Sequence, residues 1–407
     1  MKTCPYPPLL RLDNFARGAP REILDTLREG ARVVWEDDPS GAGGYWLVLH
    51  QEDIDYVLKT PSLFTSSDGP MLDDMPPQVL AEQRSSINLM DPPKHRKYRN
   101  LVDRAFRPGV MAEREPQMRA FASDIIDAVL DRGRCDFVSD IALQLPMRVI
   151  YSLLGVREGD YQRVVDLTNA LTLADDPDFA ENRQAGFFAG IELIEVGAAL
   201  AADHRQHPRN TVTMAVLNEE IDGEKLTDRE YGFFFQALIV GGIDTTRNSL
   251  AWAMLEFIRH PEQYALLQSD LGLVPNAVEE ILRLHNPVFY IRRTAAEDVV
   301  LGDQQIRRGD RLAVILGGPN RDSRYFPDAD RFDITRSPEL ARKHYRTFGA
   351  GPHYCIGAHQ ARMNLLVMVE AIARRLYNPR LLGEPRFARS IFMDGIKTLP
   401  VAFDSSP

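Results

Sequence analysis

The sequence predicts a mainly α-helical fold with a minor β-sheet component, and three observations support this fold class. Over residues 114–204, apolar side chains recur every three or four positions, which is the period of an amphipathic helix. A second helical pattern follows Thr227 and meets no proline before Pro261. Short apolar segments bounded by turn-forming residues occupy residues 33–49 and 299–316, and these predict small sheets.

The first predicted strands flank a loop that is rich in turn-forming residues. Val33 to Trp35 is apolar, residues 37–44 contain aspartate, proline, serine and glycine, and Tyr45 to Leu49 is apolar again. Such a pattern is typical of two short strands joined by a turn. Residues 299–316 contain Gly302 and Gly309 between alternating apolar residues, which predicts further short strands.

The helix after Thr227 has a clear start and an unusual middle. Thr227 and Glu230 match the capping box, in which each side chain accepts a hydrogen bond from the other residue's N–H group. A helix of about 30 residues would span roughly 45 Å. Gly241 and Gly242 lie near its middle, where each costs about 1 kcal/mol relative to alanine. We therefore expect a ligand or another backbone to lie against this turn.

The composition is that of an ordinary globular protein. The chain has 407 residues, of which 44% are hydrophobic, and no linker-like tract divides it, so we expect a single domain over residues 1–407. The net charge of -10 argues against nucleic acid as the main partner. The apolar stretch 233–243 is shorter than the roughly 18 residues of a membrane span, and the N-terminus lacks the pattern of a secretion signal. We therefore expect a cytoplasmic monomer without a membrane partner.

Cys355 stands in the most informative segment, residues 348–357, which have the sequence FGAGPHYCIG. The other two cysteines, Cys4 and Cys135, are too distant for a four-cysteine zinc site. A helical pattern follows Cys355, and the N–H groups at the start of a helix lower the pKa of a thiol. Gly349 and Gly357 let the backbone approach a flat ligand and turn its amides toward the sulfur.

Three interpretations of Cys355 compete. A lone cysteine is often a buried structural residue. A nucleophilic cysteine is the rival chemical interpretation, but no base or orienting group accompanies it in the sequence. The pattern F-G-x-G-x-H-x-C-x-G fixes six residues, and a chance match is on the order of one in a million. The segment resembles the haem-binding loop of the cytochrome P-450 family, which implies that Cys355 is the axial ligand of the haem iron and that Phe348, Gly349 and Gly357 lie against the cofactor.

Three further segments match the family in the order that it requires. Residues 241–245, with the sequence GGIDT, resemble the part of the family's central helix that covers the oxygen-binding face. The resemblance implies that Gly241 lies against the cofactor, that Thr245 hydrogen-bonds the bound oxygen and that Asp244 helps to relay protons. These two polar residues are therefore the predicted catalytic residues. The alternative, a capping or solvent-facing pair, is disfavoured by the flanking glycines and by Cys355.

A second segment predicts a structural network. Glu280 and Arg283 are three residues apart and share one face of a helix, which is weak evidence when taken alone. The resemblance adds Arg331 from a later loop. It implies that the carboxylate and the two guanidinium groups bind one another and hold the cysteine loop in position.

The resemblance also names residues for the haem propionates. Residues 90–99, with the sequence MDPPKHRKYR, resemble the family's D-P-P-x-H-x-x-x-R, and His95 and Arg99 share a face of a helix that starts near Pro93. By resemblance these two residues bind a propionate, together with Arg293 and His353. Arg292 competes with its neighbour for this role.

The resemblance implies a triangular helical domain around a buried haem b, with small β-sheets. It implies a monooxygenase that inserts one oxygen atom from O2 into a hydrophobic small molecule, by C–H hydroxylation or epoxidation. The implied pocket residues are Met71, Leu238, Val288, Phe289, Phe392 and Met393. Two alternatives stay open. A peroxide-using, coupling or rearranging enzyme is disfavoured by the Asp244–Thr245 pair, and a haem-based gas-binding protein is disfavoured because no output domain is visible.

Electrons are expected from another protein. The sequence has no G-x-G-x-x-G motif after a strand and no second domain for flavin, so we expect a ferredoxin and an NAD(P)H-dependent reductase as partners. Positive residues cluster in two segments that border the cysteine side of the haem in the family, namely Lys94, Arg96, Lys97, Arg99, Arg104 and Arg107, and Arg342, Lys343 and Arg346. We expect this charge to steer an acidic ferredoxin, the alternative being a merely solvated charged face.

Overall fold

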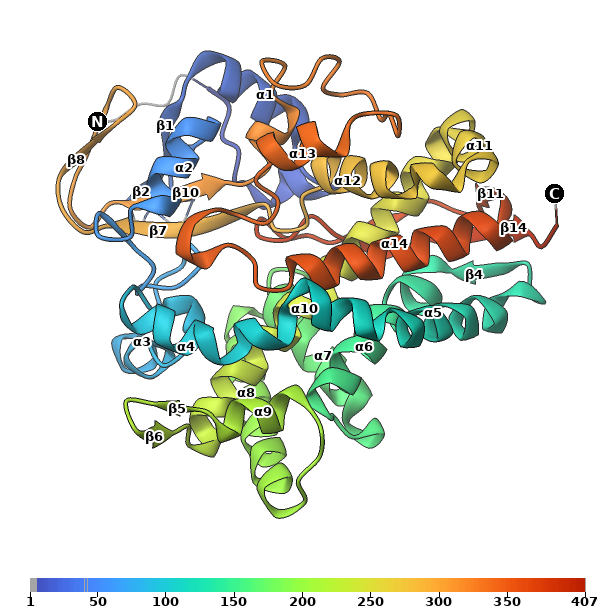
Figure 1. The fold of residues 1–407 in the computed structure, drawn as a ribbon. Coiled ribbons are helices and arrows are strands. Elements are labelled where there is room, and N and C mark those ends of the chain that lie inside the picture. The colour runs from blue at the N-terminus through green and yellow to red at the C-terminus, as the bar shows by residue number, and fades with distance from the viewer. Residues whose placement is uncertain (1–5, 40, 42, 407) are drawn as a thin grey trace.

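The computed structural model describes residues 6–39, 41 and 43–406, so Cys4 lies outside the described part of the chain. Helices dominate the fold, as the sequence predicts (Figure 1). The helices are α1 (Arg21–Gly30), α2 (Gln51–Lys59), α3 (Pro77–Gln83), α4 (Lys94–Asp103), α5 (Pro108–Leu130), α6 (Gln144–Leu154), α7 (Tyr161–Thr172), α8 (Arg183–Gln206), α9 (Val212–Asn218), α10 (Asp228–Arg259), α11 (Pro261–Ser269), α12 (Val274–Leu284), α13 (Pro338–His344) and α14 (Ala358–Arg375).

Short strands form several small sheets. The strands are β1 (Val33–Asp37), β2 (Gly44–Val48), β3 (Phe64–Thr65), β4 (Arg134–Asp136), β5 (Glu220–Ile221), β6 (Glu224–Lys225), β7 (Tyr290–Ala295), β8 (Val299–Leu301), β9 (Gln304–Ile306), β10 (Arg311–Ile315), β11 (Tyr377–Leu381), β12 (Arg386–Phe387), β13 (Ile396–Thr398) and β14 (Pro400–Asp404). The strands predicted over residues 33–49 and 299–316 are confirmed, as β1, β2 and β8 to β10. The helical pattern over residues 114–204 is confirmed as α5 to α8, with the short strand β4 as an interruption.

Helix α10 is the central element of the fold. Its first turn contains the predicted capping box, since the Glu230 N–H donates to Thr227 Oγ1 (3.2 Å) and the Thr227 N–H donates to Glu230 Oε2 (2.8 Å). The helix ends at Arg259, and at 1.5 Å per residue it is roughly 48 Å long. In Figure 1, α14 and α5 run in front of it. Helix α10 therefore crosses the whole fold.

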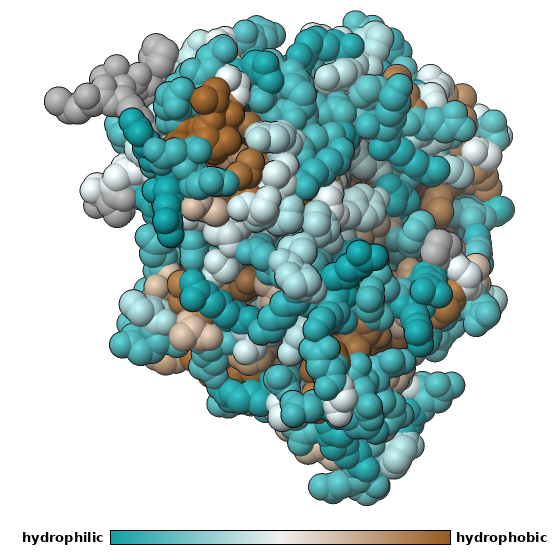
Figure 2. Space-filling model, turned by 60° about the vertical axis from the view of Figure 1, so that its left-hand side comes forward, coloured by the Kyte–Doolittle hydropathy of each residue, from teal (hydrophilic) through white to brown (hydrophobic). Residues whose placement is uncertain are grey.

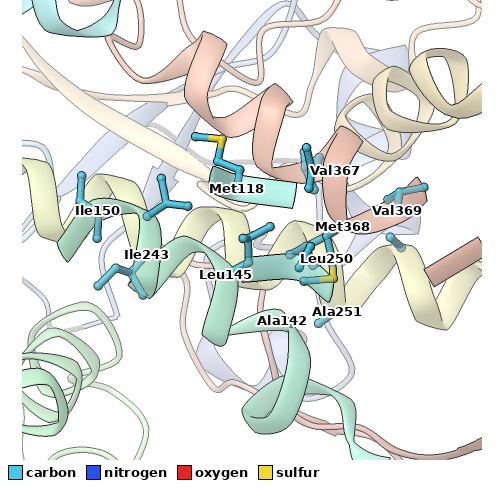
Figure 3. Close-up of a cluster of buried hydrophobic side chains, with 14 of the residues drawn as sticks. Met118, Ala142, Leu145, Ile150, Ile243, Leu250, Ala251, Val367, Met368 and Val369 are labelled. Carbon is cyan, nitrogen blue, oxygen red and sulfur yellow. The ribbon is translucent and has the colours of Figure 1, made fainter. Parts of the chain in front are cut away.

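The largest hydrophobic core forms where α6 and α14 pack against α10 and α5 packs against both of them. Figure 3 shows the buried side chains that meet there, among them Met118, Leu145, Ile150, Ile243, Leu250, Val367 and Met368. Leu250 of α10 and Met368 of α14 are completely buried in this cluster. Because this packing holds α14 against α10, it also places the cysteine segment, which immediately precedes α14, beside the middle of α10.

The main sheet has five strands in the order β1-β2-β10-β7-β3. The pair β10/β2 is parallel, whereas β1/β2, β10/β7 and β3/β7 are antiparallel. Strand β7 lies inside this sheet, and Arg293 pairs there with Leu312 of β10. The sheet therefore places the side chains of β7 at fixed positions next to the helical part of the molecule.

Helix α8 is the element whose length and apolar composition would suit a membrane span, from Gln184 to Gln206. It packs along α10 at close range, because a Cβ at Gly197 would lie 2.5 Å from Phe235 Cβ and one at Gly232 would lie 2.3 Å from the Ile194 carbonyl oxygen. The face of the molecule in Figure 2 is mostly hydrophilic, with separate small apolar groups. The apolar character of α8 thus serves helix packing in this fold.

Candidate active site

Cys355 lies in the loop between the short 3-10 turn Gly351–His353 and α14. Its N–H donates to the Phe348 carbonyl oxygen (2.9 Å), and the Gly357 N–H donates to its sulfur. These bonds hold the sulfur at the start of α14, where the sequence places it. Arg362, one helical turn further along, lies over the Phe348 ring at 4.4 Å and covers the outer side of the loop.

Burial raises the pKa of the Cys355 thiol above its usual value. The Gly357 N–H and the charges of Arg99 and Arg362 act in the opposite direction but do not overcome burial. The expectation of a lowered pKa at this helix start is therefore wrong for the free thiol, because removing a thiolate from water costs more than these groups return. A metal cation bound to the sulfur would reverse the balance, since it supplies a full opposite charge.

The sulfur faces a cavity of about 250 Å³ between the cysteine loop and α10. The predicted site residues that line it are Leu238, Gly241, Thr245, Val288, Phe348, Gly349, His353, Cys355 and Gly357. A Cβ at Gly241 would meet no atom within 4 Å, whereas a Cβ at Gly242 would lie 3.3 Å from Ile150 of α6. The two helix glycines therefore have different functions. Gly241 keeps the cavity clear, and Gly242 allows two helices to pack closely.

Four basic side chains meet beside the cavity. The rings of His95 and His353 have centroids 3.9 Å apart, Arg99 donates to the Pro352 carbonyl (3.0 Å), and Arg293 is buried next to His353. Burial, followed by the charge of Arg99, lowers the pKa of His95 to about 4. Burial, followed by the charges of Arg293 and His95, lowers the pKa of His353 to about 2. Burial is the main cause of both low pKa values, and the neighbouring positive charges add to it.

The two arginines that compete for the propionate role, Arg292 and Arg293, are neighbours in β7 but have different surroundings. Arg292 donates to Asp74 (2.7 Å) and to the Leu72 carbonyl (3.3 Å), so it holds the loop before α3. Arg293 points to the other face of the strand, as the alternation of side chains requires. Burial lowers the pKa of Arg293 to about 10, and none of the described carboxylates forms an ion pair with it. The geometry favours Arg293 over Arg292 as the ligand of an anionic group.

Asp244 and Thr245 lie on different sides of α10. Thr245 lines the cavity, and its Oγ1 donates to the Gly241 carbonyl (2.7 Å). Asp244 is buried outside the cavity, where its carboxylate accepts a hydrogen bond from Thr172 of α7 (2.6 Å) and pairs with Arg247 (3.2 Å). The structure therefore places the predicted hydroxyl in the cavity and the predicted carboxylate behind it.

The predicted structural network is present, but the structure places Arg336 in it where the sequence predicts Arg331. Glu280 and Arg283 form two hydrogen bonds of 2.7 Å in the protein interior. The second guanidinium is that of Arg336, whose Nε lies 3.2 Å from Glu280 Oε2. Arg331 is exposed, and its part in the network is a carbonyl oxygen that accepts from Arg283 (3.3 Å). The chain turns between Arg331 and Arg336, so the Arg336 side chain faces the protein interior, toward Glu280.

This network reaches the cysteine loop through Asn320. Arg283 Nη1 donates to the Asn320 carbonyl (2.9 Å), the Asn320 side chain donates to Thr347 Oγ1 (2.8 Å), and its Oδ1 accepts from the Arg346 N–H (2.8 Å). Thr347 directly precedes Phe348. The buried ion pair thus holds the start of the loop that carries Cys355.

Four of the six predicted pocket residues do not line the cavity, namely Met71, Phe289, Phe392 and Met393. Val288 faces the cavity, while Phe289 points the opposite way and packs edge-on against Phe15, with ring centroids 5.0 Å apart. Met393 forms an isolated antiparallel bridge with Val288 and is buried in a small cluster with Leu173 and Ala388. The sequence therefore predicts too many lining residues. Adjacent residues in extended chain face opposite sides, so a neighbour of a lining residue can point away from the cavity.

Sequence reasoning missed polar residues that line the cavity. Gln360 and Asn364 of α14 and Ser249 of α10 contribute to its wall. A pattern in the sequence could have indicated them. Two amides four residues apart lie on a helix face that is otherwise apolar, with Ala361 and Leu365 beside them.

Two glycine substitutions are expected to separate folding from ligand binding. In Gly351→Ala, the Cβ would lie 2.2 Å from the Leu58 carbonyl oxygen at a φ of +69°, so we expect a loss of stability of more than about 1–3 kcal/mol. In Gly241→Ala, the Cβ points into open space, so we expect unchanged or slightly higher stability with weaker cofactor or substrate binding. Urea denaturation and ligand titration measure the two effects. Equal stability of the two variants would contradict this assignment.

The residues present fit the haem that the sequence resemblance implies. A thiol stands on one wall of the cavity, and a glycine without a side chain stands on the opposite wall. Four basic groups lie at the edge. Asp103 pairs with Arg99 (3.2 Å), and the Asp91 carboxylate already accepts from the Ser66 N–H and the Thr65 hydroxyl. A flat cofactor with anionic substituents matches all three features. His95, Arg99, Arg293 and His353 would hold its propionates, and Cys355 its iron.

Comparison with known proteins agrees with this geometry. A family model described as cytochrome P450 matches residues 191–377. The chain is 34% identical over 387 residues to a steroid C26-monooxygenase of Mycolicibacterium smegmatis, covering 93% of this chain and 89% of the relative. It is 34% identical over 364 residues to a methyl-branched lipid omega-hydroxylase of Mycobacterium tuberculosis, covering 88% and 84%.

A solved structure is similar over almost the whole chain. It is a cytochrome P450 of Mycobacterium marinum in complex with pseudoionone, with 32% sequence identity, a TM-score of 0.89 and coverage of 99% of this chain and 100% of that one. The expected mainly helical P450 fold is thereby confirmed. Similarity of this extent, in sequence and in structure, shows that the chain belongs to the cytochrome P450 family of haem-thiolate monooxygenases.

Proposed function

We propose that this monooxygenase hydroxylates an unactivated C–H bond of a hydrophobic, lipid-like molecule, with electrons from a separate ferredoxin. The observation that carries the proposal is the cavity above Cys355. Its wall is mostly apolar, with Leu238, Ile291 and Leu316 among its members, and Thr245 supplies a hydroxyl from α10. Such a cavity binds apolar substrates and keeps a few polar groups for the reaction.

The chain's own residues would divide the work as follows. A haem held by Cys355 would supply the activation of O2, which the thiolate ligand favours. Gly241 leaves the opposite wall open for O2 and substrate. Thr245 holds a proton at Oγ1, and the Gly241 carbonyl orients that hydroxyl. Asp244 would help to relay protons from behind α10, where Thr172 and Arg247 hold its carboxylate.

The relatives narrow the substrate class. One is named for oxidation of a steroid at C26 and another for the omega position of a methyl-branched lipid, so both names describe oxidation of an alkyl group on a large apolar molecule. The apolar wall of this cavity would bind the same kind of chain, because burying each CH2 group contributes about 0.8 kcal/mol. We therefore propose steroid-like or branched-chain lipids, oxidised on an alkyl carbon.

A reconstituted assay tests this function. The purified protein is combined with a ferredoxin, its reductase, NAD(P)H and ¹⁸O2, and a branched-chain lipid or steroid is supplied as substrate. We expect an alcohol that carries one ¹⁸O atom. Product formed with peroxide and not with the electron-transfer proteins would support the peroxide-using alternative. Binding of carbon monoxide without turnover of any substrate would support the gas-binding alternative.

Part of the positive charge near the cysteine loop is available to a partner. Lys97 pairs with Asp222 (2.6 Å), Arg104 with Glu219 (3.3 Å) and Arg342 with Glu279 (2.8 Å). Four exposed residues of these two segments have no ion-pair partner among the described residues, namely Lys94, Arg96, Arg107 and Lys343. A hollow lined by Met111, Arg342, Arg346, Phe348, Gly349 and Arg362 lies between these segments. We propose that an acidic ferredoxin docks there.

Charge reversal tests this docking surface. Arg96→Glu is expected to lower the second-order rate of reduction by ferredoxin several-fold and to weaken its dependence on salt, because long-range attraction accelerates encounter. Stopped-flow reduction at several ionic strengths measures both effects. Arg134→Glu is the matched control, since this exposed residue lies in β4, beyond the far end of α5. Equal rates for the two variants would remove the proposed surface.

A further inference from the structure

A short hairpin connects α9 to α10. Strands β5 and β6 pair antiparallel, with Ile221 opposite Glu224, and Asp222 and Gly223 form the two-residue turn between them. Both turn residues have a positive φ, 54° and 87°, as the tightest hairpin turns require. Ile221 packs against the largest core, and Leu226, which follows β6, is buried in it. The hairpin is therefore held firmly at both ends.

The hairpin is acidic and contacts the basic segment that contains α4. Residues 219–224 have the sequence EEIDGE, with four carboxylates in six residues. Lys97 Nζ lies 2.8 and 2.6 Å from the two carboxylate oxygens of Asp222, and Arg104 Nη1 lies 3.3 Å from Glu219 Oε1. Both ion pairs are at the surface, since the four side chains are 44–71% exposed. The hairpin thus neutralises two positive residues of the segment that we assign to ferredoxin docking.

The positive side chains of α4 point in different directions, because successive residues of a helix are about 100° apart. Lys97 faces the hairpin, which lies below α4 in Figure 1. Arg99 faces the cysteine loop, where it donates to the Pro352 carbonyl oxygen. Arg96 is exposed. The hairpin therefore occupies one side of the surface that a partner would approach, beside the exposed guanidinium of Arg96.

The carboxylates of the hairpin compete with those of an acidic partner. Such a partner has to break the ion pairs of Lys97 and Arg104 before it can use their charge, and Glu220 and Glu224 add repulsion. Existing pairs and like-charge repulsion are the means by which a surface rejects partners that bind weakly. Exposed pairs are individually weak and are screened by salt, so a partner with enough carboxylates can replace them.

We propose that the β5–β6 hairpin is a selectivity element of the electron-transfer surface, and that its carboxylates screen Lys97 and Arg104 so that only a strongly acidic partner docks rapidly. The inference rests on the proposed ferredoxin docking for the identity of the partner, whereas the screening is a property of this chain. Glu219 and Asp222 are positioned to determine which partner binds, and they take no part in the chemistry at the cavity.

The rate of reduction by ferredoxin tests the proposal. The variant Glu219→Gln/Asp222→Gly removes both pairing carboxylates, and glycine suits the positive φ at the turn. We expect its second-order rate constant to rise several-fold at low salt and to approach the wild-type value at high salt, because the added attraction is long-range. Stopped-flow spectroscopy measures this rate.

Asp127→Asn/Asp404→Asn is the matched control for this variant. It removes the same charge from two exposed carboxylates that also pair with arginines, one towards the far end of α5 and one in β14. A rate for the hairpin variant equal to that of the control would overturn the proposal. A slower rate would also overturn it, because it would show that the carboxylates bind the partner.

A double-mutant cycle tests whether the hairpin screens Lys97. In the wild-type background, Lys97→Gln is expected to slow reduction less than Arg96→Gln, because Asp222 already neutralises Lys97. In the Asp222→Gly background, Lys97→Gln is expected to slow reduction as much as Arg96→Gln. An effect of Lys97→Gln that is the same in both backgrounds would overturn the proposal.

Binding of a short, labelled polyglutamate peptide separates a failure of this inference from a failure of the proposed partner, because it requires no electron transfer. We expect the hairpin variant to bind the peptide several-fold more tightly at low salt than the wild-type protein and the control. If dithionite reduces every variant and ferredoxin reduces none, the proposed partner is wrong. The peptide then still decides, since tighter binding supports the screening and equal binding overturns it.

Discussion

Replacing Cys355 with alanine is expected to abolish the strongly red-shifted Soret band of the reduced, carbon-monoxide-bound protein. Product formation should fall by more than about 100-fold, which exceeds the cost of losing a group that merely supports a metal ligand. The reason is that the sulfur faces the cavity and accepts from the Gly357 N–H at the start of α14, where it would bind the haem iron. Difference spectra and the ferredoxin-coupled assay measure the two effects.

Cys135→Ala is the matched control for this experiment. Cys135 is buried in β4, away from the cavity, and burial raises the pKa of its thiol to about 12. Its removal should leave the Soret band in place. The basic cluster around Arg293 is intact in both variants, so bound cofactor should decrease less than activity. A normal thiolate-type band in Cys355→Ala would refute the assignment of the axial ligand.

Replacing Glu280 with alanine is expected to destabilise the fold by about 3–5 kcal/mol, because it leaves two buried guanidinium groups without their carboxylate. Glu280 accepts from Arg283 at 2.7 Å and from the Asp333 N–H at 3.1 Å, and Arg336 lies 3.2 Å away. A whole domain has a free energy of unfolding of about 5–15 kcal/mol, so this loss is severe. The urea midpoint of the purified protein measures it.

The paired variants Arg331→Ala and Arg336→Ala distinguish the two candidate arginines. Arg331 is exposed and contributes a backbone carbonyl, so its truncation should change stability by less than about 0.5 kcal/mol. Arg336 is largely buried beside Glu280, so its loss should be clearly destabilising. The cysteine loop depends on this network through Asn320, and weaker retention of the cofactor should accompany the unfolding. A larger loss of stability in Arg331→Ala than in Arg336→Ala would instead support Arg331 as the partner of Glu280.

Much of the site could be predicted where one continuous segment carries the information. The loop around Cys355 and the turn at Gly241 bring their glycines, hydroxyls and sulfur within a few residues of each other, and local backbone geometry places them. The capping box at Thr227 is equally local, and it marked the start of the longest helix correctly. In each case the structure depends on interactions within about one or two helical turns, which a residue pattern records directly.

Contacts between distant segments needed the tertiary structure. Whether Arg331 or Arg336 meets Glu280 depends on how a loop turns some 50 residues further along, and both arginines satisfy the same local pattern. The lining of the pocket depends on strand orientation, which places Val288 inside and Phe289 outside. Asp244 lies next to Thr245 in sequence, yet the 100° step between helical residues turns it to α7.

The sequence by itself determined the fold class, the candidate thiolate donor and the order of the four family segments, because each depends on short-range pattern and on residue chemistry. The tertiary structure decided which side chains share a space. It selected Arg293 over Arg292, replaced one network arginine by another, and placed the unpaired amides of Gln360 and Asn364 in the cavity wall. These choices depend on the packing of α10 against α14 and on strand alternation, which act between residues far apart in the chain.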